Sequence, residues 1–299
     1  MSLSQPGDEG SPAVDPEHPR ILRVFSNNAV LVRGEDDVEK ILVGRGIGFG
    51  RRTGERIKAD QAQRTYVPLN PDTAPLIASI DQLDPAVLQH VGAAVDLATD
   101  LLGDLHPSVY LLLTEHLSFA IGRVREGQRL HTGILSEVAG AFPEEFQAAQ
   151  LIVHYLNAAL PETILPEEEA AAVALHLNAA RSGVPVKTPL AHANLLAAWV
   201  AHIHEATGIT SAEDEELVAA LVRLYRRIES GQTRHCPLVE VVSQQLSSDY
   251  QLATTIIAQM GDEAPGEAAY FAVFLHGWRQ AYKPIISQHI QRRKENPDG

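Results

Sequence analysis

The sequence predicts a multidomain protein in which a small antiparallel β domain precedes two all-α helical-bundle domains. Short β-prone runs separated by turn residues occupy positions 20–50. From about Pro75 onward, apolar residues recur with the period of roughly 3.6 that is typical of amphipathic helices. A repeated pattern within this helical part indicates two tandem bundles.

The β domain is expected to contain three or four short strands. Residues 21–25, 29–32 and 38–43 are rich in β-branched and other apolar side chains, and Asn, Asp and Gly between these runs favour turns. A glycine-dense connection, residues 44–50, follows the third run. Because so small a meander is barely stable alone, we expect it to dimerise or to dock on another domain.

Helical periodicity begins with an apolar stripe between residues 87 and 101. Three further helices are expected over residues 109–120, 147–156 and 167–180, and Gly, Pro and Asp breaks separate them into a bundle. The residues of the first stripe are Val87, Val91, Ala94, Leu97 and Leu101.

The helical part repeats two landmarks. Residues 123–128 recur in modified form at 227–232, and the Glu-Ala-Ala of residues 169–171 recurs at 267–269. The offsets between copies are similar, which predicts two helical domains of related structure. We assign them to residues 76–184 and 185–293.

Charge is distributed unevenly along the chain, whose net charge is −14. Residues 1–19 carry four acids and no Lys or Arg, and their Ser, Pro and Gly content is typical of a disordered acidic tail. Residues 20–64 carry ten Lys or Arg against six Asp or Glu. Because the local field determines which partners a surface attracts, a basic β domain is compatible with a phosphate-bearing partner.

Several classes of protein are disfavoured. The chain has no apolar run of 18 or more residues and no signal segment, so we expect a soluble cytoplasmic protein without membrane insertion. Its single cysteine, Cys236, cannot form an internal disulfide. Residues 44–50 lack the Lys-Ser/Thr of a phosphate-binding loop. His202 and His204 lie two residues apart, on different faces of a helix, and are interpreted as solvent-facing. No catalytic residue, cofactor or metal is therefore expected.

Two histidines interrupt apolar helical stretches, His116 in the first helical domain and His176 further along it. A neutral imidazole is nucleophilic near physiological pH and can accept a phosphoryl group. The alternative is a hydrogen-bonded histidine that belongs to the core, and the spacing alone does not decide between the two.

These segments resemble the BglG/SacY family of transcriptional antiterminators. The resemblance rests on Val-Phe-Ser-Asn-Asn-Ala-Val-Leu-Val at 24–32, on Val-Gly-Arg-Gly-Ile-Gly-Phe-Gly-Arg-Arg-Thr-Gly at 43–54, and on the segments that end at His116 and His176. It covers nearly all of the chain from residue 20 onward.

The resemblance implies a co-antiterminator RNA-binding domain at residues 20–75. Such a domain forms a homodimer that binds a hairpin in the leader mRNA, prevents a terminator from forming and so activates sugar-utilisation genes. By position, the RNA contacts would come from Arg23, Asn28, Gly44, Arg45, Gly46 and Phe49. For Phe49 the alternative is that the ring belongs to the core of the small sheet.

The resemblance also implies that both helical domains are regulation domains of the sugar phosphotransferase system (PTS). His116 and His176 would be phosphorylated by the PTS sugar permease through its EIIB domain, and the phosphocarrier HPr is a further implied partner. The second domain departs from the family pattern, because Ala220 stands where its first histidine is expected. Its other histidine position is either Phe274 or, in a downstream frame, His276. This loss argues against activation by HPr through that domain and favours a role in dimerisation.

Overall fold

A computed structural model describes residues 18–34, 37–66, 84–128, 134–209 and 215–295, with side chains described up to residue 282. The predicted acidic tail therefore lies, apart from its last two residues, outside the described residues. The chain divides into two compact units. The first comprises residues 1–131 and 144–186, and the second comprises residues 132–143 and 187–299.

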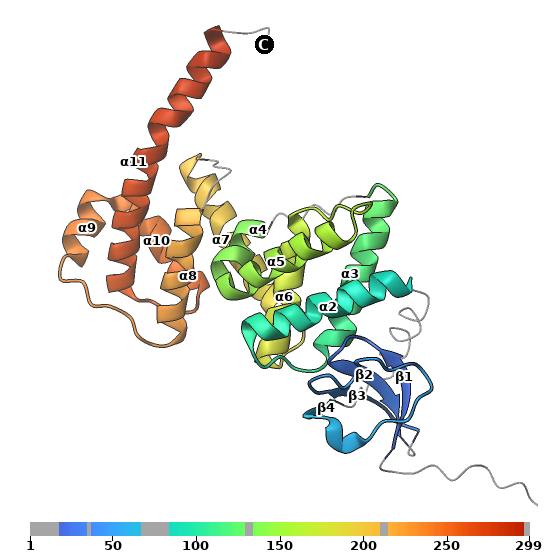
Figure 1. Ribbon diagram of the computed structural model, residues 1–299. Coiled ribbons are helices and arrows are strands. Elements are labelled where there is room, and N and C mark those ends of the chain that lie inside the picture. Colours follow the sequence, from blue (N-terminus) through green and yellow to red (C-terminus); the bar gives the residue numbers. More distant parts are fainter. Residues whose placement is uncertain (1–17, 35–36, 67–83, 129–133, 210–214, 296–299) are drawn as a thin grey trace, which may run out of the picture. The chain divides into compact units, whose positions relative to one another are not determined.

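The first unit opens with a four-stranded antiparallel sheet in the order β1-β2-β3-β4 (Figure 1). Its register pairs Ala29 with Val43 and Val24 with Val30. Alternation of side chains between the two faces of each strand gives the sheet a buried face, as the β-branched runs predict. The elements are β1 (Arg20–Val24), β2 (Ala29–Arg33), β3 (Glu39–Val43), a short 3₁₀ turn (Ala59–Gln61) and β4 (Arg64–Tyr66).

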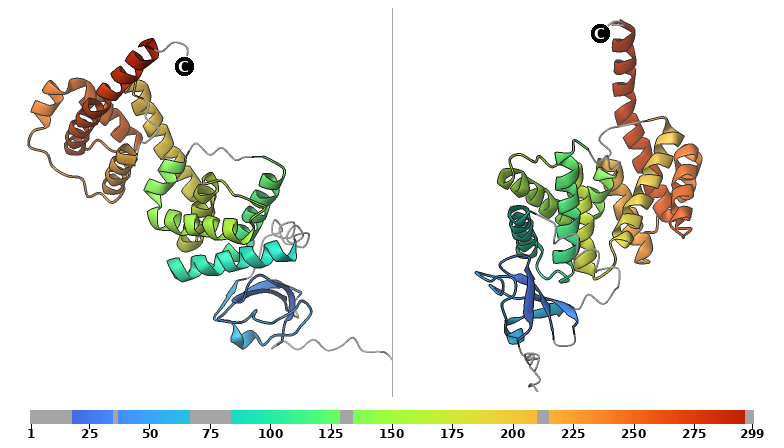
Figure 2. Two further views of the ribbon diagram at one scale, coloured as in Figure 1. Left: turned by 45° about the horizontal axis from the view of Figure 1, so that its top comes forward. Right: turned by 90° about the vertical axis from the view of Figure 1, so that its right-hand side faces the viewer.

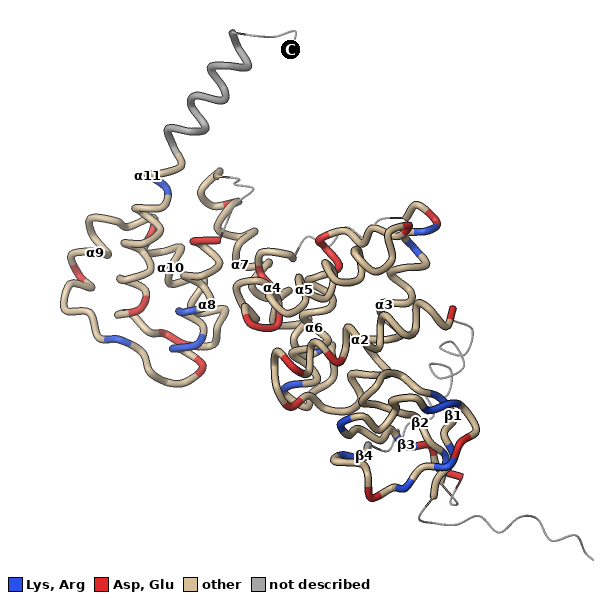
Figure 3. The backbone as a smooth tube through the Cα atoms, in the orientation of Figure 1, with Lys and Arg blue, Asp and Glu red and all other residues tan. Residues whose placement is uncertain are grey.

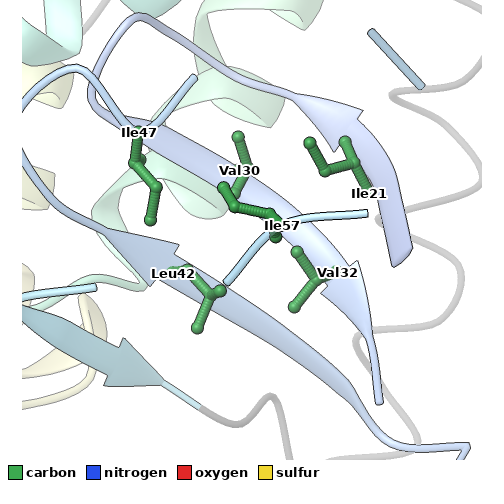
Figure 4. Close-up of a cluster of buried hydrophobic side chains, with 6 residues drawn as sticks. All are labelled: Ile21, Val30, Val32, Leu42, Ile47 and Ile57. Carbon is green, nitrogen blue, oxygen red and sulfur yellow. The ribbon is translucent and has the colours of Figure 1, made fainter. Parts of the chain in front are cut away.

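The core of this β domain (residues 18–66) is a small apolar cluster (Figure 4). Val30 and Val32 alternate along β2 and point to the same face, where side chains from β1, β3 and the following loops meet them. The buried members of the cluster are Ile21, Val30, Val32, Leu42, Ile47 and Ile57.

The remainder of the first unit is helical. The elements are α2 (Pro85–Leu102), α3 (Val109–Arg125), α5 (Pro143–Ala159) and α6 (Glu168–Ser182). Helix α3 packs against both α2 and α6. Helix α2 lies beside the sheet in Figure 1 and in both views of Figure 2. The β domain therefore docks on the first helical domain, as its small core led us to expect.

Helix α2 shows how local sequence sets an element and its buried face. Asp84 caps the helix by accepting a hydrogen bond from the Ala86 amide, and Pro85 occupies the first turn. The expected stripe was wrong at its carboxyl end, because Leu101 is 47% exposed. At that end Val95 and Ala98 are buried instead, and Leu101 lies in the last turn of the helix.

The second unit is entirely helical within its described residues. It includes α4, which the sequence analysis placed inside the first helical domain, and α4 packs against α7 and α8. Its elements are α4 (Leu135–Ala141), α7 (Lys187–Thr207), α8 (Glu215–Glu229), α9 (Val239–Gln245), α10 (Ser247–Gln259) and α11 (Pro265–Glu295).

The fold class predicted from the sequence is confirmed, with a small antiparallel sheet followed by helical domains. No helix in the described part of the chain is both long and apolar enough to cross a membrane. The interpretation of His202 and His204 as solvent-facing was wrong, because both are half-buried. The His204 ring lies nearly parallel to the Trp278 ring, with 6.4 Å between ring centroids.

Candidate functional site

The glycine-rich loop (residues 44–50) is held in place by Asn28, which precedes β2. The Asn28 carbonyl accepts a hydrogen bond from the Gly44 amide, and its side-chain oxygen accepts one from the Gly46 amide, both at 2.9 Å. Gly46 has a φ of +71°, in the left-handed region that glycine adopts at little cost. These bonds close the loop into a turn that presents its outer side chains to solvent.

Arg45 and Phe49 are the side chains that the loop exposes. Phe49 is 73% exposed, which is unusual for a large aromatic residue and excludes the alternative of a core aromatic. Ile47, which lies between them, is buried in the cluster and anchors the loop to the sheet. The loop therefore offers one guanidinium and one aromatic face on a rigid base.

The other predicted contact residues are not equally available. Gly44 is buried, and a Cβ added to it would lie 2.7 Å from the Gln61 carbonyl oxygen. Its glycine is therefore required by packing inside the protein. Asn28 uses both of its oxygens to organise the loop. Arg23 is half-buried and lines a hollow of about 620 Å³ together with Arg51 and residues of α2.

Figure 3 colours several Lys and Arg positions along the backbone of the β domain. They agree with the local excess of ten Lys or Arg over six Asp or Glu in residues 20–64. A positive surface with an exposed aromatic side chain is suited to a polyanion that has unpaired bases.

The turn between β1 and β2 is joined to the first helical domain through Asp96 of α2. Asp96 Oδ1 accepts hydrogen bonds from Ser26 Oγ and from the Tyr110 hydroxyl, each at 2.8 Å. Burial raises the pKa of Asp96 and outweighs these hydrogen bonds. The sequence analysis missed this junction, because an Asp in the middle of a helix carries no signal of a partner 70 residues away.

Close approach of α2 to the β domain requires a small residue at Gly92. A Cβ at that position would overlap the Phe25 carbonyl oxygen. Ser26 Oγ also accepts a hydrogen bond from the Asn28 amide at 3.0 Å. A continuous set of hydrogen bonds thus runs from Asp96 through Ser26 and Asn28 to Gly46 in the loop.

The first helical domain brings His116 of α3 and His176 of α6 together. Their ring centroids are 4.9 Å apart. His116 Nε2 lies 3.4 Å from Glu169 Oε2, and Arg123 Nη2 lies 2.8 Å from Glu169 Oε1. The structure therefore brings together two histidines that are 60 residues apart in the sequence, and one of them, His116, contacts a buried carboxylate.

The environment of this pair favours a neutral imidazole at His176. Burial, with a smaller contribution from His116, lowers the pKa of His176 to about 3. Burial raises the pKa of Glu169, but its contacts with His116 and Arg123 outweigh that effect and lower it overall. A neutral imidazole has a nucleophilic nitrogen at physiological pH.

In the second unit the same framework lacks the histidines. Arg227 Nε lies 2.9 Å from Glu267 Oε1, which matches the Arg123–Glu169 pair of the first domain. Ala220 and Phe274 line the adjoining pocket of about 310 Å³. Arg123 and Arg227 begin one landmark of the sequence repeat, and Glu169 and Glu267 begin the other. In each domain the two landmarks therefore supply the two partners of one ion pair.

His276 belongs to a different contact. Its Nδ1 lies 3.0 Å from Asp249 Oδ2, and Arg279 also binds Asp249. In the first domain, Asn178 and Arg181 contact Glu145 at 3.4 Å and 3.1 Å with the same spacing. This correspondence favours Phe274, and not His276, as the counterpart of His176. Among the described residues, no three His, Cys, Asp or Glu side chains are placed to hold a metal ion.

Two family models match the chain, and they fall on the two sites. Residues 20–74 match the CAT RNA binding domain, and residues 97–180 match the PRD domain. The β-glucoside operon antiterminator of Dickeya chrysanthemi is 31% identical over 160 residues, which cover 53% of this chain and 56% of that protein. The transcription antiterminator LicT of Bacillus subtilis is 27% identical, over 53% of this chain and 57% of that protein.

The chain is homologous to these antiterminators. It carries a CAT RNA-binding domain and a PRD domain. It spans about half the length of the curated relatives it matches. Those relatives are regulators and not enzymes by name. The crystal structure of GlcT CAT-PRDI aligns with 55% of this chain and 98% of that chain, at 24% identity and a TM-score of 0.42.

Proposed function

We propose that this protein is a transcriptional antiterminator that binds a hairpin in a leader mRNA and so prevents a terminator from forming. The observation that carries the proposal is the exposed pair of Arg45 and Phe49 on a loop that Asn28 holds rigid. An arginine fork binds phosphate or a base edge, and an exposed aromatic ring stacks on an unpaired base. We further propose that the protein acts as a homodimer and that Arg23 and Gly46 complete the RNA surface.

The test uses the full chain and a pool of RNA hairpins with randomised internal loops, and measures binding by electrophoretic mobility shift. We expect enrichment of an imperfect hairpin, and about 10- to 100-fold weaker binding of it by Arg45→Ala. A transcription template whose terminator overlaps the enriched hairpin should show more readthrough when the protein is added. If the wild type and Arg45→Ala bind the hairpin with equal affinity, the loop is not part of the RNA-binding site.

We also propose that phosphorylation of His116 and His176 by the PTS sugar permease, through its EIIB domain, controls this activity. The proposal is supported by the neutral His176 ring and by the shared contact of His116 and Arg123 with Glu169. Phosphorylation would place a dianion beside a buried carboxylate and disturb the packing of α3 on α6. Incubation with phosphorylated EIIB should label the wild type with acid-labile phosphate, and should not label a variant with Ala at both positions.

The route from the histidines to the RNA loop is proposed to pass through Asp96. Helix α3 carries both His116 and Tyr110, and Tyr110 binds Asp96, which binds Ser26 beside the loop. In an Asp96→Ala variant, phosphorylation should no longer alter RNA affinity. The matched control is Asp100→Ala, which removes an exposed carboxylate one turn further along α2. Unchanged coupling in Asp96→Ala would exclude this route.

Loss of both histidine positions in the second unit supports a further part of the proposal. We propose that residues 185–293 are a degenerate regulation domain that HPr does not phosphorylate, and that residues 76–184 are the responsive one.

A further inference from the structure

We infer that the pocket of the second unit beside Glu267 is a binding site for a small phosphate monoester, such as a sugar phosphate. The inference does not depend on RNA binding or on histidine phosphorylation. It concerns the place where the second domain lacks its histidines. The pocket has a volume of about 310 Å³ and is lined by Ala220, Arg223, Leu224, Arg227, Arg234, Tyr270, Phe271 and Phe274.

Three arginines give this pocket its charge. Glu267 is fully buried and accepts two hydrogen bonds from the Arg227 guanidinium and two from that of Arg234, at 2.8–3.0 Å. Although burial raises the pKa of Glu267, these bonds lower it to about 2. One carboxylate therefore orients two guanidinium groups, and a third arginine, Arg223, also lines the pocket. The pocket carries a formal excess of positive charge.

The corresponding place in the first domain is built differently. There Glu169 is contacted by one arginine, Arg123, and by His116. In the second domain the histidine position is Ala220, and Arg234 supplies the second contact to the carboxylate. Replacing a large ring by a methyl group leaves space beside the arginines. A site without a nucleophile can bind a phosphate group but cannot accept it covalently.

The remaining lining suits an organic substituent on the phosphate. The Arg234 guanidinium lies over the Tyr270 ring, with its Cζ 4.2 Å from the ring centroid, and both residues line the pocket. Phe271 and Phe274 lie in parallel with 5.9 Å between their ring centroids. Arginine forks match a phosphate dianion, and aromatic rings offer flat apolar surfaces to the C–H face of a sugar. The volume is at the lower end of the range for small-ligand pockets, about 300–1,000 Å³.

The inference is tested on the full chain by isothermal titration calorimetry with glucose 6-phosphate, inorganic phosphate and glucose as probes. We expect glucose 6-phosphate to bind with a stoichiometry of one per chain and glucose not to bind. Arg223→Ala should weaken binding about tenfold, because it removes one charged hydrogen-bonding group from an exposed position. The affinity of Arg223→Lys should lie between those of the wild type and Arg223→Ala, since lysine retains the charge but lacks the forked guanidinium.

Two controls separate this site from others. Arg226→Ala removes the same charge from the same helix, but Arg226 binds the Ala141 carbonyl outside the pocket. This variant should therefore bind glucose 6-phosphate as tightly as the wild type does. Arg45→Ala should also bind normally, which excludes the β domain as the source of the signal. Absence of binding to the wild type, or equal affinity in Arg223→Ala, would overturn the inference. Equal affinity for inorganic phosphate and glucose 6-phosphate would overturn the assignment of an ester.

Discussion

Ser26 Oγ donates a hydrogen bond of 2.8 Å to Asp96 Oδ1, and this bond joins the β1–β2 turn to helix α2. The same serine oxygen accepts the Asn28 amide proton, and Asn28 in turn holds Gly46. The glycine-rich loop and the first helical domain therefore share one hydrogen-bond network. Because Asp96 also binds Tyr110, this network extends to helix α3.

Asp96→Ala should destabilise the protein. It removes the acceptor of two hydrogen bonds from the buried residues Ser26 and Tyr110, and a hydrogen bond to a charged group contributes about 1.5–3 kcal/mol. We expect the free energy of unfolding, measured by urea denaturation, to fall by about 2–4 kcal/mol. Asp100→Ala, at an exposed site on the same helix, should change it by less than about 0.5 kcal/mol. Equal effects of the two substitutions would show that the junction contributes nothing.

Phe49→Ala should separate stability from binding. Since the ring is 73% exposed, its removal should change the free energy of unfolding by less than about 1 kcal/mol. Loss of base stacking should weaken RNA binding by about 1–3 kcal/mol. Phe25→Ala is the contrasting variant, because Phe25 is 1% exposed and its truncation should cost about 3–5 kcal/mol of stability. A large loss of stability in Phe49→Ala would contradict the exposed position of the ring.

The salt dependence of RNA binding should report on Arg45. If Arg45 binds a phosphate, Arg45→Ala lowers the slope of log affinity against log salt concentration by about 1. Arg33 is the matched control, since it ends β2 at the opposite end from Asn28 and pairs with Glu39. Arg33→Ala should leave both the slope and the affinity near wild-type values. Mobility-shift titrations at several salt concentrations provide the measurement.

Acid sensitivity of folding should depend on His176. Its pKa is about 3 in the folded protein and about 6.5 when unfolded, so only the unfolded chain is protonated between these values. The contribution of the neutral His176 ring to the free energy of unfolding is complete above pH 6.5 and is lost as the pH falls toward 3. Between pH 7 and 5 we expect His176 to account for a loss of about 2 kcal/mol.

Urea denaturation of wild type and His176→Phe at the two pH values isolates this contribution. Phenylalanine is chosen because Phe274 lines the corresponding pocket of the second domain. The variant should lose less stability on acidification than the wild type, whereas His154→Gln, at an exposed site of α5, should behave as the wild type does. An unchanged pH dependence in His176→Phe would mean that the buried ring is protonated at little cost.

Much of the candidate site could be read from local sequence. Arg45 and Phe49 were indicated by the resemblance of residues 43–54 to the antiterminator family, and the sequence left a core position open as the alternative for Phe49. What could not be read is the packing role of Gly44, which depends on the distant backbone of Gln61. The carboxyl end of the α2 stripe was misjudged for a related reason. Burial there depends on which neighbour covers the helix, and apolar spacing alone does not contain that information.

The sequence by itself determined the order of the domains, the strands of the sheet and the repeat in the helical part, because these follow from periodicity, turn chemistry and short-range pattern. Only the tertiary structure decided which residues meet. It joined the two landmarks of the repeat into the ion pairs Arg123–Glu169 and Arg227–Glu267, and it placed Asp96 against Ser26. Contacts between residues far apart in the chain arise from the packing of whole elements, so no local pattern specifies them.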